Sequence, residues 1–75
     1  MDEYTRIEKD VRMFETNLTY LIKKYEKLSD LQEKIVDLSK QYYDDSKYYM
    51  KKKDYFTAFG CINYAHGLLD AIIKF

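Results

Sequence analysis

Apolar side chains recur every three or four residues through the first two thirds of the chain. The first run consists of Tyr4, Ile7, Val11, Phe14, Leu18, Leu21, Tyr25 and Leu28. The same spacing continues through Leu31, Ile35, Leu38 and Tyr42. This spacing draws one narrow apolar stripe along a helix, as in coiled-coil packing. Because the 75 residues include no proline and only two glycines, little interrupts a helix, and we expect an all-α fold.

Capping residues divide this long periodic pattern into helices. Residues 29–32, Ser-Asp-Leu-Gln, form a capping-box pattern, which predicts that one helix begins at residue 30. Three lysines at 51–53 suit a helix C-terminus, and Asp54 suits the N-cap of the next helix. We therefore predict a single domain, residues 1–75, with helices over 3–27, 30–52 and 54–74. Their similar lengths favour an antiparallel up-down-up three-helix bundle.

Composition limits how so small a chain can be stabilised. Cys61 has no second cysteine to pair with, and with a lone His66 it cannot complete a zinc site of four N/S ligands. Helix packing or self-association must then stabilise the core. We also expect a cytoplasmic protein with no signal sequence and no membrane span, because residues 1–27 mix acids and bases throughout and the longest apolar windows are interrupted by Asn63, His66, Asp70 and Lys74.

The segment from Asp54 onward has a wider apolar arc than one buried stripe needs. Apolar side chains cover more than half of its circumference. The excess predicts a protein partner, either a larger protein or a second copy in a homodimer. The candidate partner surface consists of Tyr43, Tyr48, Tyr64, Leu68 and Phe75.

Three segments carry a family resemblance: residues 42–46 (YYDDS), residues 54–58 with Asp54, Tyr55 and Ala58, and residues 63–71 (NYAHGLLDA). Together they resemble the archaeal domain of unknown function 357. The resemblance implies a small three-helix bundle and, since no activity is established in that family, it implies no function. Glycine commonly precedes the aspartate in that family, where this chain has Lys53; a left-handed lysine there would cost about 1 kcal/mol relative to glycine.

A second likeness is to one tetratricopeptide hairpin. Small residues at Ser46, Ala58 and Ala65 would let two antiparallel helices approach closely. Such repeats need about three copies to be stable, and the first helix shows no copy of the pattern, so we interpret the likeness as convergent hairpin packing.

A narrow polar face of the last helix is the main candidate for ligand binding. It carries Asn63, His66, Gly67 and Asp70, and Asp45 could approach it from the preceding helix. His66 and Asp70 stand four residues apart, so the carboxylate could orient the imidazole, as an acid–base or nucleotide-binding site requires. The competing interpretation is a surface ion pair or a histidine that hydrogen-bonds across a helix interface.

Tyrosines around the three lysines at 51–53 suggest a third function, the binding of single-stranded nucleic acid. Neighbouring acids such as Asp44 and Asp54 cancel much of this charge, and the chain is neutral overall, with 13 basic and 13 acidic side chains. We expect no nucleic-acid partner. Because no nucleophile, phosphate loop or metal-ligand spacing is present, we expect a non-enzymatic interaction module without cofactor or metal.

Overall fold

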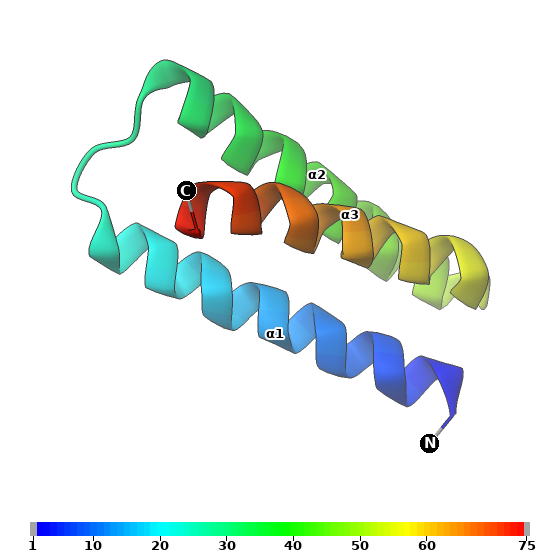
Figure 1. Cartoon of the computed structure of the whole chain (residues 1–75). Helices are drawn as coiled ribbons and strands as arrows, with labels where there is room; N and C mark the ends of the chain where they lie inside the picture. Colours follow the sequence, from blue (N-terminus) through cyan, green and yellow to red (C-terminus); the bar gives the residue numbers. More distant parts are fainter. Residues whose placement is uncertain (1, 75) are drawn as a thin grey trace.

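In a computed structural model that describes residues 2–74, the chain folds into three helices, each antiparallel to the one before it. They are α1 (Glu3–Lys24), α2 (Asp30–Lys51) and α3 (Tyr55–Ile73), and the described residues contain no strand. Figure 1 shows α3 between the other two helices, with the chain ends at opposite ends of the bundle. The Cα envelope measures 37 × 20 × 17 Å. The predicted all-α, up-down-up three-helix bundle is confirmed.

Side-chain caps begin each helix where the local sequence places them. The Asp2 carboxylate accepts the Thr5 backbone N–H at 2.7 Å, which caps α1. At α2 both halves of the capping box are present, with Ser29 and Gln32 each accepting the other's backbone N–H. Asp54 caps α3 through the Thr57 N–H and hydroxyl. The predicted helix starts near residues 3, 30 and 54 are therefore confirmed to within one residue.

The end of α1 differs from the prediction. The helix ends at Lys24 instead of residue 27, because Tyr25 adopts an extended conformation with φ −106° and ψ 111°. Tyr25 and Leu28 are half-buried against the core. The connection therefore keeps its two apolar side chains turned toward the core outside the helix. The ends of α2 and α3, at Lys51 and Ile73, each come one residue before the predicted position.

A Schellman turn joins α2 to α3. The Asp54 N–H donates to the Tyr49 carbonyl at 2.9 Å, and the Lys53 N–H donates to the Met50 carbonyl at 3.0 Å. This motif requires a left-handed residue between helix and cap, and Lys53 adopts φ 63°. Lysine therefore occupies a position that suits glycine, and its Cβ strains the turn.

Replacement of Lys53 by glycine should stabilise the bundle. Glycine adopts positive φ without a Cβ clash, so Lys53→Gly should raise the free energy of unfolding by about 1 kcal/mol in urea titrations followed by circular dichroism. Lys52→Gly, at the neighbouring right-handed C-cap, is the matched control and should not stabilise. Equal effects of the two substitutions would contradict the assignment of strain to Lys53.

The core forms where one stripe of α3 meets the other two helices. Five α3 side chains are buried: Ala58, Ile62, Ala65, Leu69 and Ile72. Helix α1 contributes Ile7, Val11, Phe14 and Leu21. Helix α2 contributes Val36, Ser39, Ser46 and Met50. The apolar rhythm thus marks the buried side of α1 but not that of α2, where Leu31 and Leu38 remain exposed.

Small residues bring α2 and α3 into close contact. Ser46, Ala58 and Ala65 are completely buried, and the Ser46 hydroxyl donates to the Ala58 carbonyl oxygen of the facing helix at 2.7 Å. Ser39, also completely buried, satisfies its own hydroxyl on the Val36 carbonyl within α2. The close hairpin packing expected from the small residues at 46, 58 and 65 is therefore what the structure contains.

Enlargement of Ser46 should be more damaging than loss of its hydroxyl. Ser46→Ala removes one buried hydrogen bond and should cost about 1 kcal/mol. Ser46→Leu inserts methylenes into a closed helix contact and should cost about 1–3 kcal/mol more. Thermal and urea unfolding measure both effects, with exposed Lys47→Leu as control. A Ser46→Leu protein as stable as the native chain would show that the helices do not meet closely here.

Candidate functional site

His66 lies at the interface between α3 and α1. Its Nε2–H donates to the Asp10 backbone carbonyl at 2.8 Å, since a carbonyl oxygen can only accept. The Phe14 ring meets the imidazole edge-on, with centroids 5.8 Å apart and planes at 85°. The half-buried imidazole therefore fastens α1 to α3 and is oriented by a backbone oxygen rather than by the expected carboxylate of Asp70.

The other members of the predicted ligand face point elsewhere. Asp70 pairs with Lys74 one turn later at 3.7 Å, while Asn63 and Gly67 are exposed. Asp45 is exposed on α2. Within residues 2–74, no hydrogen bond or ion pair joins any two of Asn63, His66, Gly67, Asp70 and Asp45.

Cys61 occupies the flank of α3 that faces α2. It is half-buried, and burial, followed by the nearby charges of Asp45 and Asp54, raises the pKa of its thiol. The thiol form is therefore favoured over the thiolate, which is the nucleophile and metal ligand. Among the described residues, no three His, Cys, Asp or Glu side chains gather closely enough to hold a metal ion.

Tyr43 belongs to the interior contact between α1 and α2. Its ring stacks on Phe14, with centroids 5.0 Å apart, and its hydroxyl donates to the Glu15 carboxylate. Desolvation and then this hydrogen bond raise the pKa of Tyr43 to about 12. Tyr43 therefore joins two helices, although it was expected on the partner surface.

Alkaline pH should weaken the Tyr43 contact. A raised folded pKa means that the stabilisation is complete below the ordinary tyrosine pKa of 10.0 and is lost as pH rises toward about 12. Tyr43→Phe should lose about 1 kcal/mol or less at neutral pH, because the pair lies near the surface, and should show a smaller decline of stability across that alkaline window.

Urea titrations at neutral and alkaline pH measure both effects. Tyr48→Phe, at a residue that is 54% exposed, is the matched control. If native and Tyr43→Phe proteins lose stability in parallel above pH 10, the Tyr43 hydroxyl does not contribute.

The lysine and tyrosine corner is arranged as pairs of cations and rings. Lys52 Nζ lies 5.6 Å from the centroid of the Tyr48 ring, and Lys47 Nζ lies 5.2 Å from that of Tyr43. Both lysines already contact rings that a nucleic-acid base would need for stacking. Lys51 and Lys53 are exposed.

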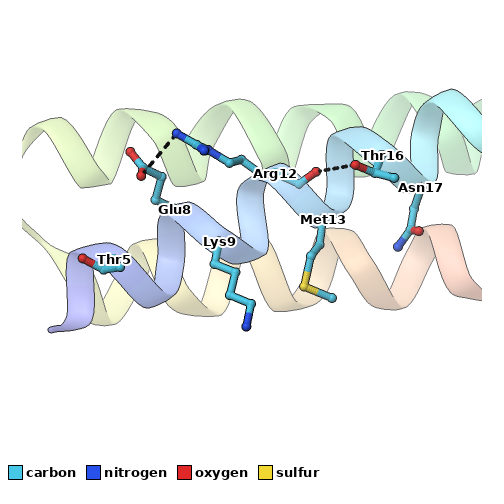
Figure 2. A pocket seen from close by; sticks show the side chains of 7 residues that line it. All are labelled: Thr5, Glu8, Lys9, Arg12, Met13, Thr16 and Asn17. Atoms are coloured by element: carbon cyan, nitrogen blue, oxygen red, sulfur yellow. Dashed lines mark hydrogen bonds and ion pairs between the residues drawn. The ribbon is translucent and has the colours of Figure 1, made fainter. Parts of the chain in front are cut away.

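Two surface depressions lie outside the predicted sites. The larger, about 410 Å³, follows the outward face of α1, and Figure 2 shows that all seven lining side chains come from that helix. Two of its three charged groups pair with each other, Glu8 with Arg12 at 3.5 Å. The smaller, about 190 Å³, lies between the first turns of α1 and α3, where Arg6 covers the Phe59 ring at 5.8 Å. Phe56, which also lines this smaller depression, is 90% exposed.

An apolar surface lies on the side of α2 and α3 away from α1. We name it the outer α2/α3 face; it consists of the exposed Leu31, Leu38 and Tyr64 and the half-buried Ile35, Tyr42 and Leu68. The α2 members repeat at spacings of four, three and four, and Tyr64 and Leu68 stand one turn apart on α3, so each set follows one side of its helix.

Ring contact joins the two halves of this face. The centroids of Tyr42 and Tyr64 lie 4.5 Å apart, so the stripes of α2 and α3 meet. Tyr64 precedes His66 by two residues, which is a rotation of about 200° around the helix axis. Because His66 faces α1, Tyr64 points away from α1. Leu31 is 68% exposed, Tyr64 54% and Leu38 38%. Tyr64 and Leu68 were predicted as partner-surface residues, whereas the α2 stripe was interpreted only as a helix signal.

Phe75, the last predicted partner residue, lies outside the described residues. Tyr48 is exposed on α2 and is not among the residues of the outer α2/α3 face.

Helix α3 is long and apolar enough to span a bilayer, with a mean hydropathy of 1.2 over its most apolar window. Central helices of globular proteins often meet the same criterion, so this is weak evidence for a membrane span.

Comparison with known proteins bears on the fold more than on the site. No curated protein matches the chain. A family model described as "Protein of unknown function (DUF357)" matches residues 9–75, which include nearly all of α1 and the whole of α2 and α3. This match agrees with the resemblance found in residues 42–46, 54–58 and 63–71. The chain therefore belongs to the DUF357 family.

Proposed function

We propose that the chain is a non-enzymatic protein-interaction module that binds its partner through the outer α2/α3 face. The observation that carries the proposal is the exposure of Leu31, Leu38 and Tyr64 on adjoining stripes of two helices. A monomer rarely leaves a continuous apolar patch of more than a few hundred Å² uncovered unless that patch serves binding. Single exposed apolar residues are ordinary, but exposed apolar residues on adjoining stripes of two helices indicate a binding surface.

The closest helix contacts of the fold lie beside this surface rather than on it, although Ile35 and Tyr42 are half-buried against the core. The close contact of α2 with α3 is made by Ser46, Ala58 and Ala65, while α1 covers the opposite side through His66 and Tyr43. The apolar side chains that this packing leaves exposed, those of Leu31, Leu38 and Tyr64, support an external role. Tyrosine, which combines a large apolar ring with a hydroxyl, is also enriched among residues that dominate binding energy.

The alternatives have less support in the contacts. A ligand site on Asn63, His66 and Asp70 would need the imidazole, whose Nε2–H is engaged by Asp10 and whose expected carboxylate pairs with Lys74. Nucleic-acid binding would need exposed rings beside unpaired cations, and Lys47 and Lys52 lie over tyrosine rings. An interaction surface requires neither rearrangement.

Site-specific photo-crosslinking in cells of the source organism tests the proposal. A benzophenone amino acid in place of Tyr64 should yield a discrete protein adduct, and Leu38→Glu in the same chain should abolish it by placing a charge on the apolar face. The matched control puts the crosslinker at Thr16, exposed on the outward face of α1. Absence of an adduct at position 64, or equal adducts from both positions, would overturn the proposal.

A further inference from the structure

We infer that the occupant of the outer α2/α3 face is a second copy of this chain, packed so that the two α2 helices run antiparallel across a two-fold axis. This inference rests on the proposed function and names its partner. An isologous contact requires that one patch complement itself, and the pattern of α2 meets that requirement.

The α2 stripe has the periodicity of a coiled-coil seam. Beyond Tyr42 it continues with Asp45 and Tyr49, so that positions 31, 35, 38, 42, 45 and 49 alternate spacings of four and three. A two-fold axis that crosses α2 midway between positions 38 and 42 places Leu38 opposite Tyr42 of the second copy, and Leu31 opposite its Tyr49. Both of these contacts join an aliphatic side chain to an aromatic ring, and symmetry repeats each of them once.

The same register gives the one charge in the seam a partner. It places Ile35 opposite Asp45 of the second copy, and Lys34, the residue before Ile35, borders the seam at that level. Lys34 and Asp45 are both exposed in the single chain, and neither takes part in an ion pair within residues 2–74. Two symmetric Lys34–Asp45 pairs would therefore form between copies. This charge complementarity favours self-recognition over an unrelated protein.

The flat outline of the face is only somewhat smaller than the surface that one partner contributes to an interface of ordinary size. At 1.5 Å per residue the 22 residues of α2 span about 33 Å, and α2 with α3 is about two helix diameters, or ~20 Å, wide. An interface of ordinary size takes about 800 Å² from each partner, about one seventh of the 5512 Å² surface of this chain. Chains of this length also often rely on self-association for stability.

A charge-swap series in sedimentation equilibrium tests the inference with the purified full chain. The native chain should be a dimer that dissociates on dilution. Lys34→Asp and Asp45→Lys each create two like-charge contacts and should weaken dimerisation about tenfold or more. The double swap restores opposite charges and should return the dissociation constant to within a few-fold of the native value.

Controls separate loss of the interface from loss of the fold. Both positions are exposed, so circular dichroism should show native helix content in all variants. Lys9→Asp, exposed on the outward face of α1, changes the net charge as Lys34→Asp does and should leave dimerisation unchanged. Leu38→Glu should abolish the dimer independently of the Lys34–Asp45 pair.

Each outcome decides between the two proposals. A native chain that stays monomeric at millimolar concentration, or a double swap that fails to restore the dimer, overturns the second-copy inference. If crosslinking from position 64 in cells still captures another protein, the interaction function stands with a different partner. If that crosslinking also fails, both proposals fall.

Discussion

The structure depends on the close approach of α2 and α3 at Ser46 and Ala58. Because both side chains are short, the two helix backbones come close enough for the Ser46 hydroxyl to donate to the Ala58 carbonyl oxygen of the neighbouring helix at 2.7 Å. A larger residue at either position would separate the helices. This contact fixes which side of α2 turns inward, and it fixes the level at which Tyr42 and Tyr64 meet.

One consequence is that α2 leaves part of its apolar content exposed. Its buried side combines Ser39 and Ser46 with Val36 and Met50, whereas Leu31 and Leu38 lie on a side that the single chain leaves exposed. Helix α1 cannot cover that side, because His66 and Tyr43 hold it on the opposite face. The uncovered stripe therefore follows from the same small residues that bring the hairpin together.

Local signals in the sequence were enough to predict the helix starts, since Ser29 with Gln32 and Asp54 act within a few residues of themselves. The early end of α1 was not predictable in this way, because Tyr25 leaves the helix to pack on residues remote in sequence. The same holds for His66, whose partner Asp10 lies 56 positions away. The spacing of apolar residues also failed to predict the buried side of α2, because two of its four buried residues, Ser39 and Ser46, are serines. The small residues at 46, 58 and 65 were the informative signal.

The measurement that most directly tests the uncovered face is the concentration dependence of backbone amide shifts in ¹⁵N-labelled native protein. If the outer α2/α3 face mediates self-association, shifts should change with concentration along Leu31–Tyr49 and around Tyr64 and Leu68, while the outward face of α1 stays constant. Shifts that do not depend on concentration, or that change mainly around Thr5–Asn17 on α1, would contradict self-association through this face.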